Sequence, residues 1–271
     1  MIILLTSPAA IQDSIGNVNQ AIVDSLKQIK SRNHFVAVVS NRSEPSWFKS
    51  AFDNTGVKFI REVGRQNGNV IKTGAEALNL NTYDVLVLAA SNDDISMAKN
   101  GGAIAVAAQW SSDRRVRELG VGVQDGNELE EVAELIGNWD GGWWYKGDGS
   151  NYSVHALADL STYGKTFTQE QFAKQLTNTV KNGGSRLTAL LSITARSLLI
   201  SNITDQSDLV WGVYPSSRSL NNDTEILSDF THRLRTTTSR VRFALRNQPL
   251  FLRHTQSAKR SAGGGVNRTD P

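Results

Sequence analysis

The stretch "VLAASNDDISMAKNGGAIAV", from Val87 to Val106, decides the fold. It reads as an apolar run, a polar turn with two adjacent aspartates, a short helix, the pair Gly101-Gly102 and a second apolar run. Continuous apolar runs of this length are typical of strands whose two faces are both covered, because such strands have no solvent-facing side. The stretch therefore predicts a strand–helix–strand unit of a parallel sheet, with acidic residues at the carboxyl end of its first strand.

The same alternation of strands and helices continues on both sides of this stretch. Apolar runs predict further strands at "IILLT", "HFVAVVSN", "KFIREV" and "LGVGVQ". Helical spacing predicts helices over residues 14–30, 69–78 and 127–136, and either Asp13 or Ser14 fits the N-cap of the first. The expected fold class is α/β, with a doubly wound and mostly parallel sheet over residues 1–137.

The bulk composition suits a globular protein. The chain has 271 residues, 39% of them apolar, and no cysteine, which excludes disulfides and thiolate metal sites. The segment "MIILLTSPAA" has neither the basic start of a signal peptide nor the length of a membrane span, so a cytoplasmic location without membrane contact is expected.

Residues 232–271 carry nine Lys or Arg and one Asp, whereas residues 1–231 carry 20 basic and 25 acidic residues. The basic character therefore belongs to the last forty residues.

The alternation of predicted strands and helices ends at "NWDGGWWYKGDGSNYS", residues 138–153, a segment rich in glycine and aromatic residues. We interpret it as a junction between domains; a ligand lip formed by Trp143, Trp144 or Tyr145 is the alternative. Beyond it, residues 154–271 are expected to form a second α/β domain with a basic terminal segment. Its predicted helices begin at a capping box of Thr168 with Gln171 and at residue 185, the latter running to residue 200.

Four short motifs in residues 1–137 resemble those of the haloacid dehalogenase-like (HAD) hydrolase superfamily. The first family motif has the form D-x-D-x-T-L-x-D-S, and this chain has "TSPAAIQDS" from Thr6 to Ser14. In that register Thr6 stands at the position of the nucleophilic aspartate and Pro8 at the position of the acid/base aspartate. The resemblance therefore implies a Rossmannoid hydrolase fold in which the first motif has lost both acids.

The other three motifs are better preserved. Ser40, with Asn41 beside it, fits the Ser or Thr that binds phosphate in the second motif, and Lys72 fits the lysine of the third. The fourth motif, G-D-x-x-x-D, supplies magnesium ligands; here Ala89-Ala90 replace its Gly-Asp, and Asp94 fits its second acid. The resemblance thus implies ligand-binding roles for Ser40, Asn41 and Lys72, and leaves Asp93 and Asp94 as candidate ligands of Mg²⁺.

Each of these residues also has a purely structural interpretation. Ser40 can cap a strand or helix, Lys72 can be a solvated charge on a helix, and Asp93 or Asp94 can cap the helix that starts near Ile95. A covalent aspartyl mechanism needs a carboxylate nucleophile, and the hydroxyl of Thr6 would need a base before it could attack phosphorus. We therefore expect a catalytically degenerate HAD-like protein, a pseudoenzyme that binds a phosphorylated ligand or a protein partner.

Two alternatives involve the second half of the chain. The stretch "DLVWGVYPSSRS" and the later basic residues resemble the first half of a type I phosphoribosyltransferase over residues 205–268, which would make Ser216, Ser217 and Arg218 a ligand-binding loop. A phosphohydrolase or a phosphoribosyltransferase-related enzyme is accordingly one alternative. The other is a nucleic-acid-binding protein that uses arginines of the basic segment, although these residues can equally form a solvated face: Arg233, Arg235, Arg240, Arg242 and Arg246.

Overall fold

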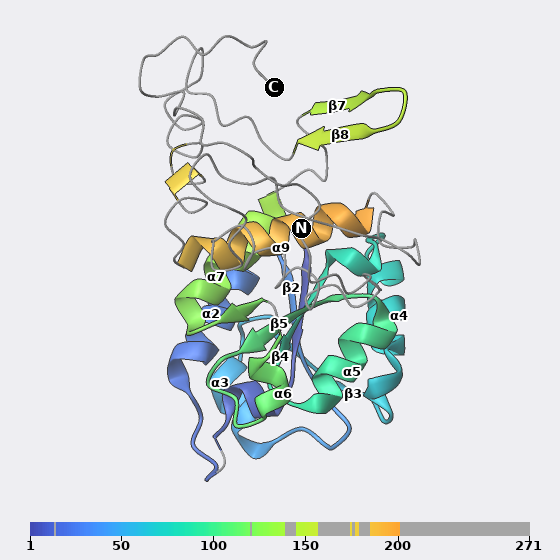
Figure 1. Cartoon of the computed structure of the whole chain (residues 1–271). Coiled ribbons are helices and arrows are strands. Elements are labelled where there is room, and N and C mark those ends of the chain that lie inside the picture. The colour runs from blue at the N-terminus through green and yellow to red at the C-terminus, as the bar shows by residue number, and fades with distance from the viewer. Residues whose placement is uncertain are drawn as a thin grey trace.

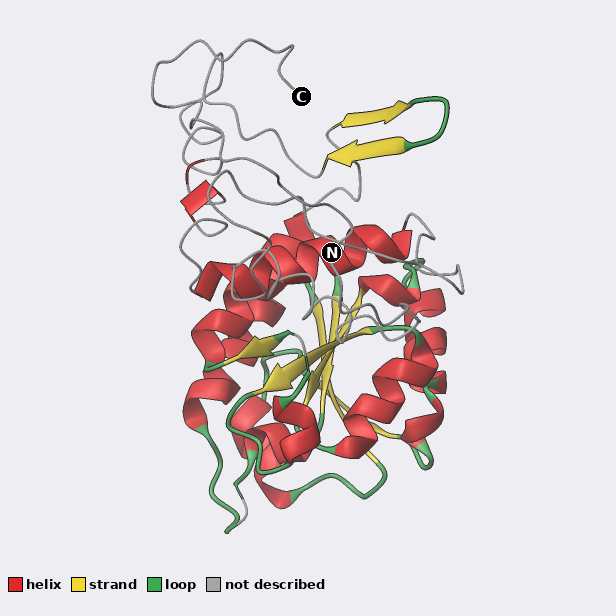
Figure 2. Ribbon diagram, viewed as in Figure 1, coloured by secondary structure: helices red, strands yellow, loops and turns green. Residues whose placement is uncertain are grey.

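A computed structural model of the chain describes residues 1–13, 15–119, 121–138, 145–156, 174, 177–178 and 185–200. Its body is a six-stranded sheet between two layers of helices (Figures 1 and 2). The strands lie in the order β3-β2-β1-β4-β5-β6, and every neighbouring pair is parallel. They are β1 (Ile3–Thr6), β2 (Phe35–Ser40), β3 (Lys58–Arg61), β4 (Val85–Ala89), β5 (Ile104–Ala108) and β6 (Gly122–Val123). The α/β doubly wound fold expected from the sequence is confirmed.

The helices follow the strands in alternation. They are α1 (Pro8–Ile11), α2 (Gln20–Ser31), α3 (Ser46–Phe52), α4 (Asn69–Ala77), α5 (Asn92–Gly101), α6 (Arg114–Arg117), α7 (Gly126–Asn138) and α9 (Ser185–Ile200). Two short 3₁₀ helices, η1 (Arg65–Asn67) and η2 (Thr82–Asp84), precede α4 and β4. The helices predicted over 69–78, 127–136 and 185–200 are confirmed to within two residues at each end.

Both faces of the sheet are covered, as the apolar strand sequences predict. Leu4 belongs to a core shared with residues of α2, α3, α7 and α9, whereas its neighbour Leu5 belongs to a core shared with α4 and α5. The same alternation runs along β2, β4 and β5. Because successive side chains of a strand point to opposite faces, a strand between two helical layers must be apolar at every position.

The first long helix starts later than predicted. Its N-cap is Asn19, whose side-chain oxygen accepts a hydrogen bond from the Ile22 N–H at 3.3 Å. Asp13 instead closes a turn, accepting from the backbone N–H groups of Ile15 and Asn17 at 3.0 and 2.8 Å. The hydrogen bond from the Asn17 N–H is the main cause of the lowered pKa of Asp13. The expected start of this helix at residue 14 was therefore wrong, and Ile15, which lies before α2, is 82% exposed.

Helix α9 comes from the expected second domain but packs on the first. It contacts α7, β5 and η2, and Leu191, Ile193 and Ala195 belong to the same core as β1 and α7. Figure 1 shows α9 lying across the amino ends of the strands. Its Arg196 forms a buried ion pair with Asp84 and donates to the Ile136 carbonyl. The first structural unit therefore includes residues on both sides of the predicted junction.

Within that junction, β7 (Tyr145–Asp148) and β8 (Ser153–Ala156) form an antiparallel hairpin. Trp143 and Trp144 lie outside the described residues, as does most of the segment that was predicted to be helical from Thr168 onward. The division into domains at residues 138–153 stays a prediction for the remaining residues. Of the helices described, none is long and apolar enough to cross a membrane.

Candidate functional site

The polar residues expected at a site converge at the carboxyl edge of the sheet. Thr6, the last residue of β1, lies in register between Val38 of β2 and Leu88 of β4. The three strands therefore end side by side, and the residues that follow them meet at one edge. In doubly wound folds this edge is where ligands bind.

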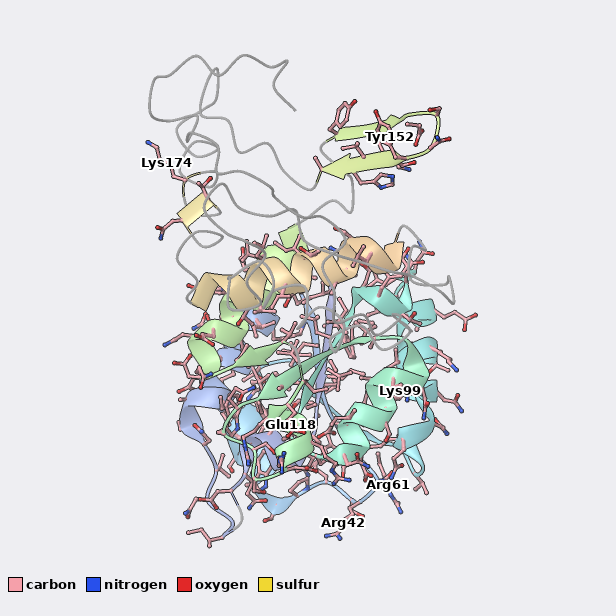
Figure 3. The ribbon with its side chains drawn as sticks, in the orientation of Figure 1. Arg42, Arg61, Lys99, Glu118, Tyr152 and Lys174 are labelled. Carbon is pink, nitrogen blue, oxygen red and sulfur yellow. The ribbon has the colours of Figure 1, made fainter. Side chains whose placement is uncertain are left out.

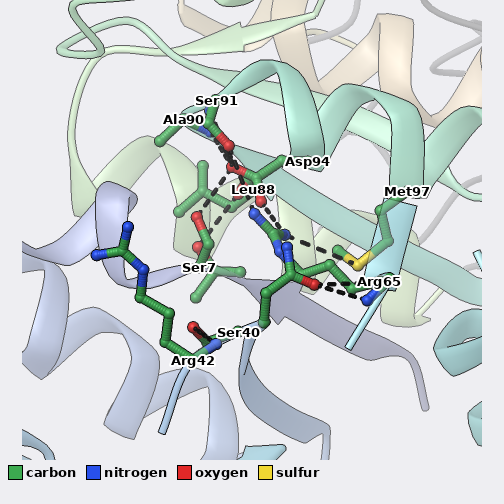
Figure 4. Close-up of polar contacts among 12 residues, drawn as sticks. Ser7, Ser40, Arg42, Arg65, Leu88, Ala90, Ser91, Asp94 and Met97 are labelled. Carbon is green, nitrogen blue, oxygen red and sulfur yellow. Dashed lines mark hydrogen bonds and ion pairs between the residues drawn. The ribbon is translucent and has the colours of Figure 1, made fainter. Parts of the chain in front are cut away.

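Asp94 is the centre of the polar contacts at this edge (Figure 4). Its carboxylate is fully buried. Oδ2 accepts from the backbone N–H groups of Ala90 and Ser91 at 3.0 and 2.9 Å, and from the hydroxyls of Ser91 and Ser7 at 2.8 and 2.9 Å. Asp94 thereby forms a capping box with Ser91 at the start of α5. A capping role for Asp94 is confirmed, but the helix begins at Asn92 with Ser91 as its N-cap, and not near Ile95.

The second oxygen of Asp94 carries an ion pair. Oδ1 accepts from the guanidinium of Arg65, a side chain that is also buried. The other guanidinium nitrogen of Arg65 lies 3.5 Å from the Ser91 hydroxyl, and its Nη1 lies 4.0 Å from the Met97 sulfur. A buried carboxylate requires a partner of this kind, because an unpaired buried charge is costly.

Arg65 is held in place by its own loop. Asn41, at the end of β2, accepts from the N–H groups of Gly64 and Arg65 at 3.0 and 3.2 Å. Gly64 and Gly68, on either side of η1, both adopt left-handed backbone conformations, which glycine allows without strain. The guanidinium is thus positioned by contacts from β2 and by the shape of the η1 turn.

These contacts do not suit a magnesium ion. Mg²⁺ requires carboxylate oxygens that are free to coordinate it in a nearly octahedral arrangement. Four donors already converge on Oδ2 of Asp94, and a cation occupies Oδ1. No group of three or more His, Cys, Asp or Glu side chains suited to a metal occurs among the described residues. The residues of this edge therefore do not fit the metal that the HAD resemblance implies.

The remaining residues of the predicted first and fourth motifs are Thr6, Pro8 and Asp93. Thr6 is buried, and its hydroxyl donates to the Leu88 carbonyl at 3.1 Å. Pro8 begins α1, a position that tolerates its missing N–H. Asp93 lies half-buried in the first turn of α5, and no ligand role follows from its position.

Of the predicted phosphate binders, two lie near the network and one does not. The Ser40 hydroxyl accepts from the Arg42 N–H at 3.0 Å, and Asn41 holds the Arg65 loop. Lys72 lies exposed on α4, and the cation that contacts Asp94 is Arg65 instead. The predicted loop Ser216, Ser217 and Arg218 and the arginines from Arg233 to Arg246 lie outside the described residues.

Three members of the network were not predicted: Ser7, Arg65 and Ser91. Ser7 follows β1 directly and Ser91 comes two residues after β4, so the rule that strand ends meet at one edge could have identified both. Arg65 lies in the polar loop "GRQNGN", where nothing local distinguishes it from a solvated charge.

Other cations at the same end of the body are exposed. Figure 3 shows Arg42 and Arg61 at the end opposite α9, and the Arg42 guanidinium makes none of the contacts drawn in Figure 4. Arg61 lies in register with Ser40 on the neighbouring strand. The arginines of α6 differ, because Arg114 pairs with Glu118 and Arg115 with Asp113. The Arg115 contact is the main cause of the lowered pKa of Asp113.

Comparison with known proteins yields structural likenesses only. No protein-family model and no curated protein matches the sequence. One similar solved structure is the cobalt-bound deoxy-D-mannose-octulosonate 8-phosphate phosphatase YrbI from Haemophilus influenzae, which is 12% identical in sequence. The match covers 50% of this chain and 88% of the phosphatase chain, with a TM-score of 0.40. Another is a protein from Streptomyces avermitilis assigned to the HAD hydrolase family, which is 15% identical in sequence. That match covers 46% of this chain and 79% of the other chain, with a TM-score of 0.36. Both likenesses concern the fold alone.

Proposed function

We propose that this chain binds a phosphorylated ligand at the carboxyl edge of its sheet and does not hydrolyse it. One observation carries the proposal: the carboxylate of Asp94, the acid that the HAD resemblance selects, is buried and paired with Arg65. A charge that is neutralised within the fold is not available for catalysis. The edge thus keeps the position of a phosphate site but lacks its acidic machinery.

The first step of an aspartyl-phosphate mechanism has no nucleophile. Thr6 stands where the family has its attacking carboxylate, and its hydroxyl donates its hydrogen to the Leu88 carbonyl. A hydroxyl attacks phosphorus only when a base removes its proton, and Leu88 contributes a peptide carbonyl, which is not a base of that strength. A carboxylate introduced at this buried position would face the same carbonyl oxygen.

Ser7 does not replace Thr6 as a nucleophile. Its hydroxyl donates to Asp94 at 2.9 Å, which superficially resembles a serine with its general base. However, the same Asp94 oxygen accepts three further hydrogen bonds, which make it part of the cap of α5. Ser7 is also only 2% exposed, which excludes a substrate from reaching it.

Binding without hydrolysis requires cations and donors that the fold does not already use. Arg42 and Arg61 are exposed, and neither has an acidic partner in the part of the chain that the structure describes. The Ser40 hydroxyl accepts a hydrogen bond from Arg42 and keeps its own hydrogen for a ligand oxygen. Two guanidinium groups at adjacent strand ends suit a phosphate, which they can bind in a bidentate manner.

The experiment combines a hydrolysis assay with a binding assay on the full chain. With Mg²⁺ present, p-nitrophenyl phosphate should release no p-nitrophenol above the rate in buffer. Inorganic pyrophosphate should raise Tm in the wild type, and the combined Arg42→Ala and Arg61→Ala variant should lose that rise. Arg114→Ala, which removes a cation that already has a partner, is the matched control and should keep it.

Two results would contradict the proposal. The first is magnesium-dependent hydrolysis that disappears in Asp94→Asn, since it would make Asp94 a working acid. The second is a Tm that pyrophosphate leaves unchanged in the wild type, or raises equally in the double variant.

A further inference from the structure

The donors around Asp94 form a complete set for an oxyanion. Two backbone N–H groups, two serine hydroxyls and one guanidinium all point at the same carboxylate. Backbone N–H groups at a helix start together with an arginine are the donors with which proteins usually hold external anions. Here the anion belongs to the chain itself.

These donors do not all belong to the amino end of one helix. Ser7 directly follows β1 and Arg65 belongs to η1, and the two residues are only 2% and 5% exposed. Both therefore enter the interior from elements other than α5 and are directed at Asp94. The two N–H groups and the Ser91 hydroxyl complete the set from the β4–α5 turn.

Two of the segments that carry these donors, the η1 loop and the β4–α5 turn, are fixed by contacts that do not involve Asp94. Asn41 holds the N–H groups of Gly64 and Arg65, and Asn100 donates to the Gln66 carbonyl at 2.7 Å. On the other side, the Ser111 hydroxyl donates to the Ala90 carbonyl at 2.7 Å. Because these contacts do not need the carboxylate, removal of Asp94 would leave the η1 loop and the β4–α5 turn in place around a space of its size.

We propose that these groups are a preformed oxyanion-binding site that the chain fills with its own Asp94 carboxylate. When that carboxylate is removed, the site takes a small monocarboxylate, with formate as the closest match to the group that is lost. In the wild type the site is closed to external anions, so a phosphorylated ligand has to bind outside it. The inference does not depend on the proposed function, because its test involves no phosphorylated ligand.

The experiment is chemical rescue of Asp94→Ala, measured as Tm of the full chain. Sodium formate should raise Tm of this variant along a saturating curve, because a ligand that binds only the folded state stabilises it by mass action. Sodium chloride at the same ionic strength should not produce that rise. The wild type, whose site is filled, should respond equally weakly to both salts.

A second destabilised variant controls for general salt effects. Leu26→Ala removes a fully buried side chain from α2, on the opposite face of the sheet, without removing an anion. It should show no formate-specific rise in Tm. Equal responses of Asp94→Ala to formate and chloride, or the same formate response in Leu26→Ala or the wild type, would overturn the proposal.

If Asp94→Ala is recovered only in unfolded form, refolding supplies the measurement. The yield of folded protein should be higher in formate than in chloride for Asp94→Ala, with no such difference for the wild type. Equal yields in the two salts would count against the site.

Discussion

The backbones of Gly68 and Gly101 approach so closely that a Cβ on Gly68 would lie 2.2 Å from the Gly101 nitrogen. Gly68 ends the η1 turn that carries Arg65, and Gly101 ends the helix that carries Asp94. Gly68 also has a φ of 78°, which side-chain-bearing residues rarely adopt. This contact therefore sets how close the two charged side chains lie.

Gly68→Ala should consequently destabilise the fold by about 2 kcal/mol or more, because the new methyl meets backbone atoms and the φ is unfavourable. Chemical denaturation measures the change. Gly74→Ala, within the helix α4 that follows Gly68, is the matched control, since nothing lies within 4 Å of its added Cβ. It should raise the free energy of unfolding by about 0.5–1 kcal/mol. A Gly68→Ala variant as stable as Gly74→Ala would contradict the packing described.

Arg65→Ala should lower the free energy of unfolding by about 3–5 kcal/mol, since it leaves Asp94 buried and charged without its cation. Arg32→Ala provides the comparison, because Arg32 pairs with Glu130 and Glu134 on the surface and its side chain is 42% exposed. Its loss should cost about 1 kcal/mol or less. If the two variants unfold at the same denaturant concentration, the Arg65–Asp94 pair is not the buried interaction seen here.

The stability of the fold should fall as the pH drops below about 6.5, the ordinary pKa of histidine. Burial, more than the nearby amino terminus, lowers the pKa of His34 in the folded chain, and its Nδ1 accepts a hydrogen bond from the Ile2 N–H at 3.3 Å. Between the lowered pKa of His34 and 6.5, this histidine binds more protons in the unfolded state than in the folded state, so stability rises with pH. The contribution of His34 to stability is fully present above this window.

The measurement is denaturant unfolding at a series of pH values on either side of 6.5. His34→Gln should reduce the slope of stability against pH in that window, although it also loses some stability at neutral pH. An unchanged slope would show that His34 titrates alike in the folded and unfolded chain.

Arg196→Ala should loosen α9, because the substitution leaves Asp84 buried without its cation. Hydrogen exchange of residues 185–200 should become faster, and Tm should fall. Thr194→Ala is the control: its hydroxyl donates to the Leu190 carbonyl of its own helix, so its loss should cost about 1 kcal/mol or less. Unaltered exchange in Arg196→Ala would mean that apolar packing alone holds α9.

Much of the fold could be predicted from local patterns. The strands from Val85 and from Ile104 are apolar at every position, and only a sheet covered on both faces explains such runs. The start of α2 could not be predicted in this way, because Asp13, which fits a helix N-cap, forms a turn with Ile15 and Asn17 instead. The choice between a cap and a turn depends on which N–H groups one side chain reaches, and spacing does not reveal it.

The position of the candidate site could be predicted from the sequence, but the contacts that determine its chemistry could not. The strand-end rule correctly selects the edge where Ser40 and Asp94 lie, and capping rules offer the role that Asp94 has. Whether Asp94 also has room for a metal depends on Arg65, which is 29 residues away in sequence and enters from a loop without a pattern. A single long-range ion pair thus decides between a cation site and a closed network.

The position of α9 has a consequence for synthesis on the ribosome. The core around β1 and α7 includes Leu191 and Ala195, which are translated more than fifty residues after α7 ends. A nascent chain that has released only α7 therefore presents an incomplete apolar layer, and the buried Asp84 still lacks Arg196. Completion of this core during translation has to await α9, and until then its unfinished apolar layer is exposed to chaperones and proteases.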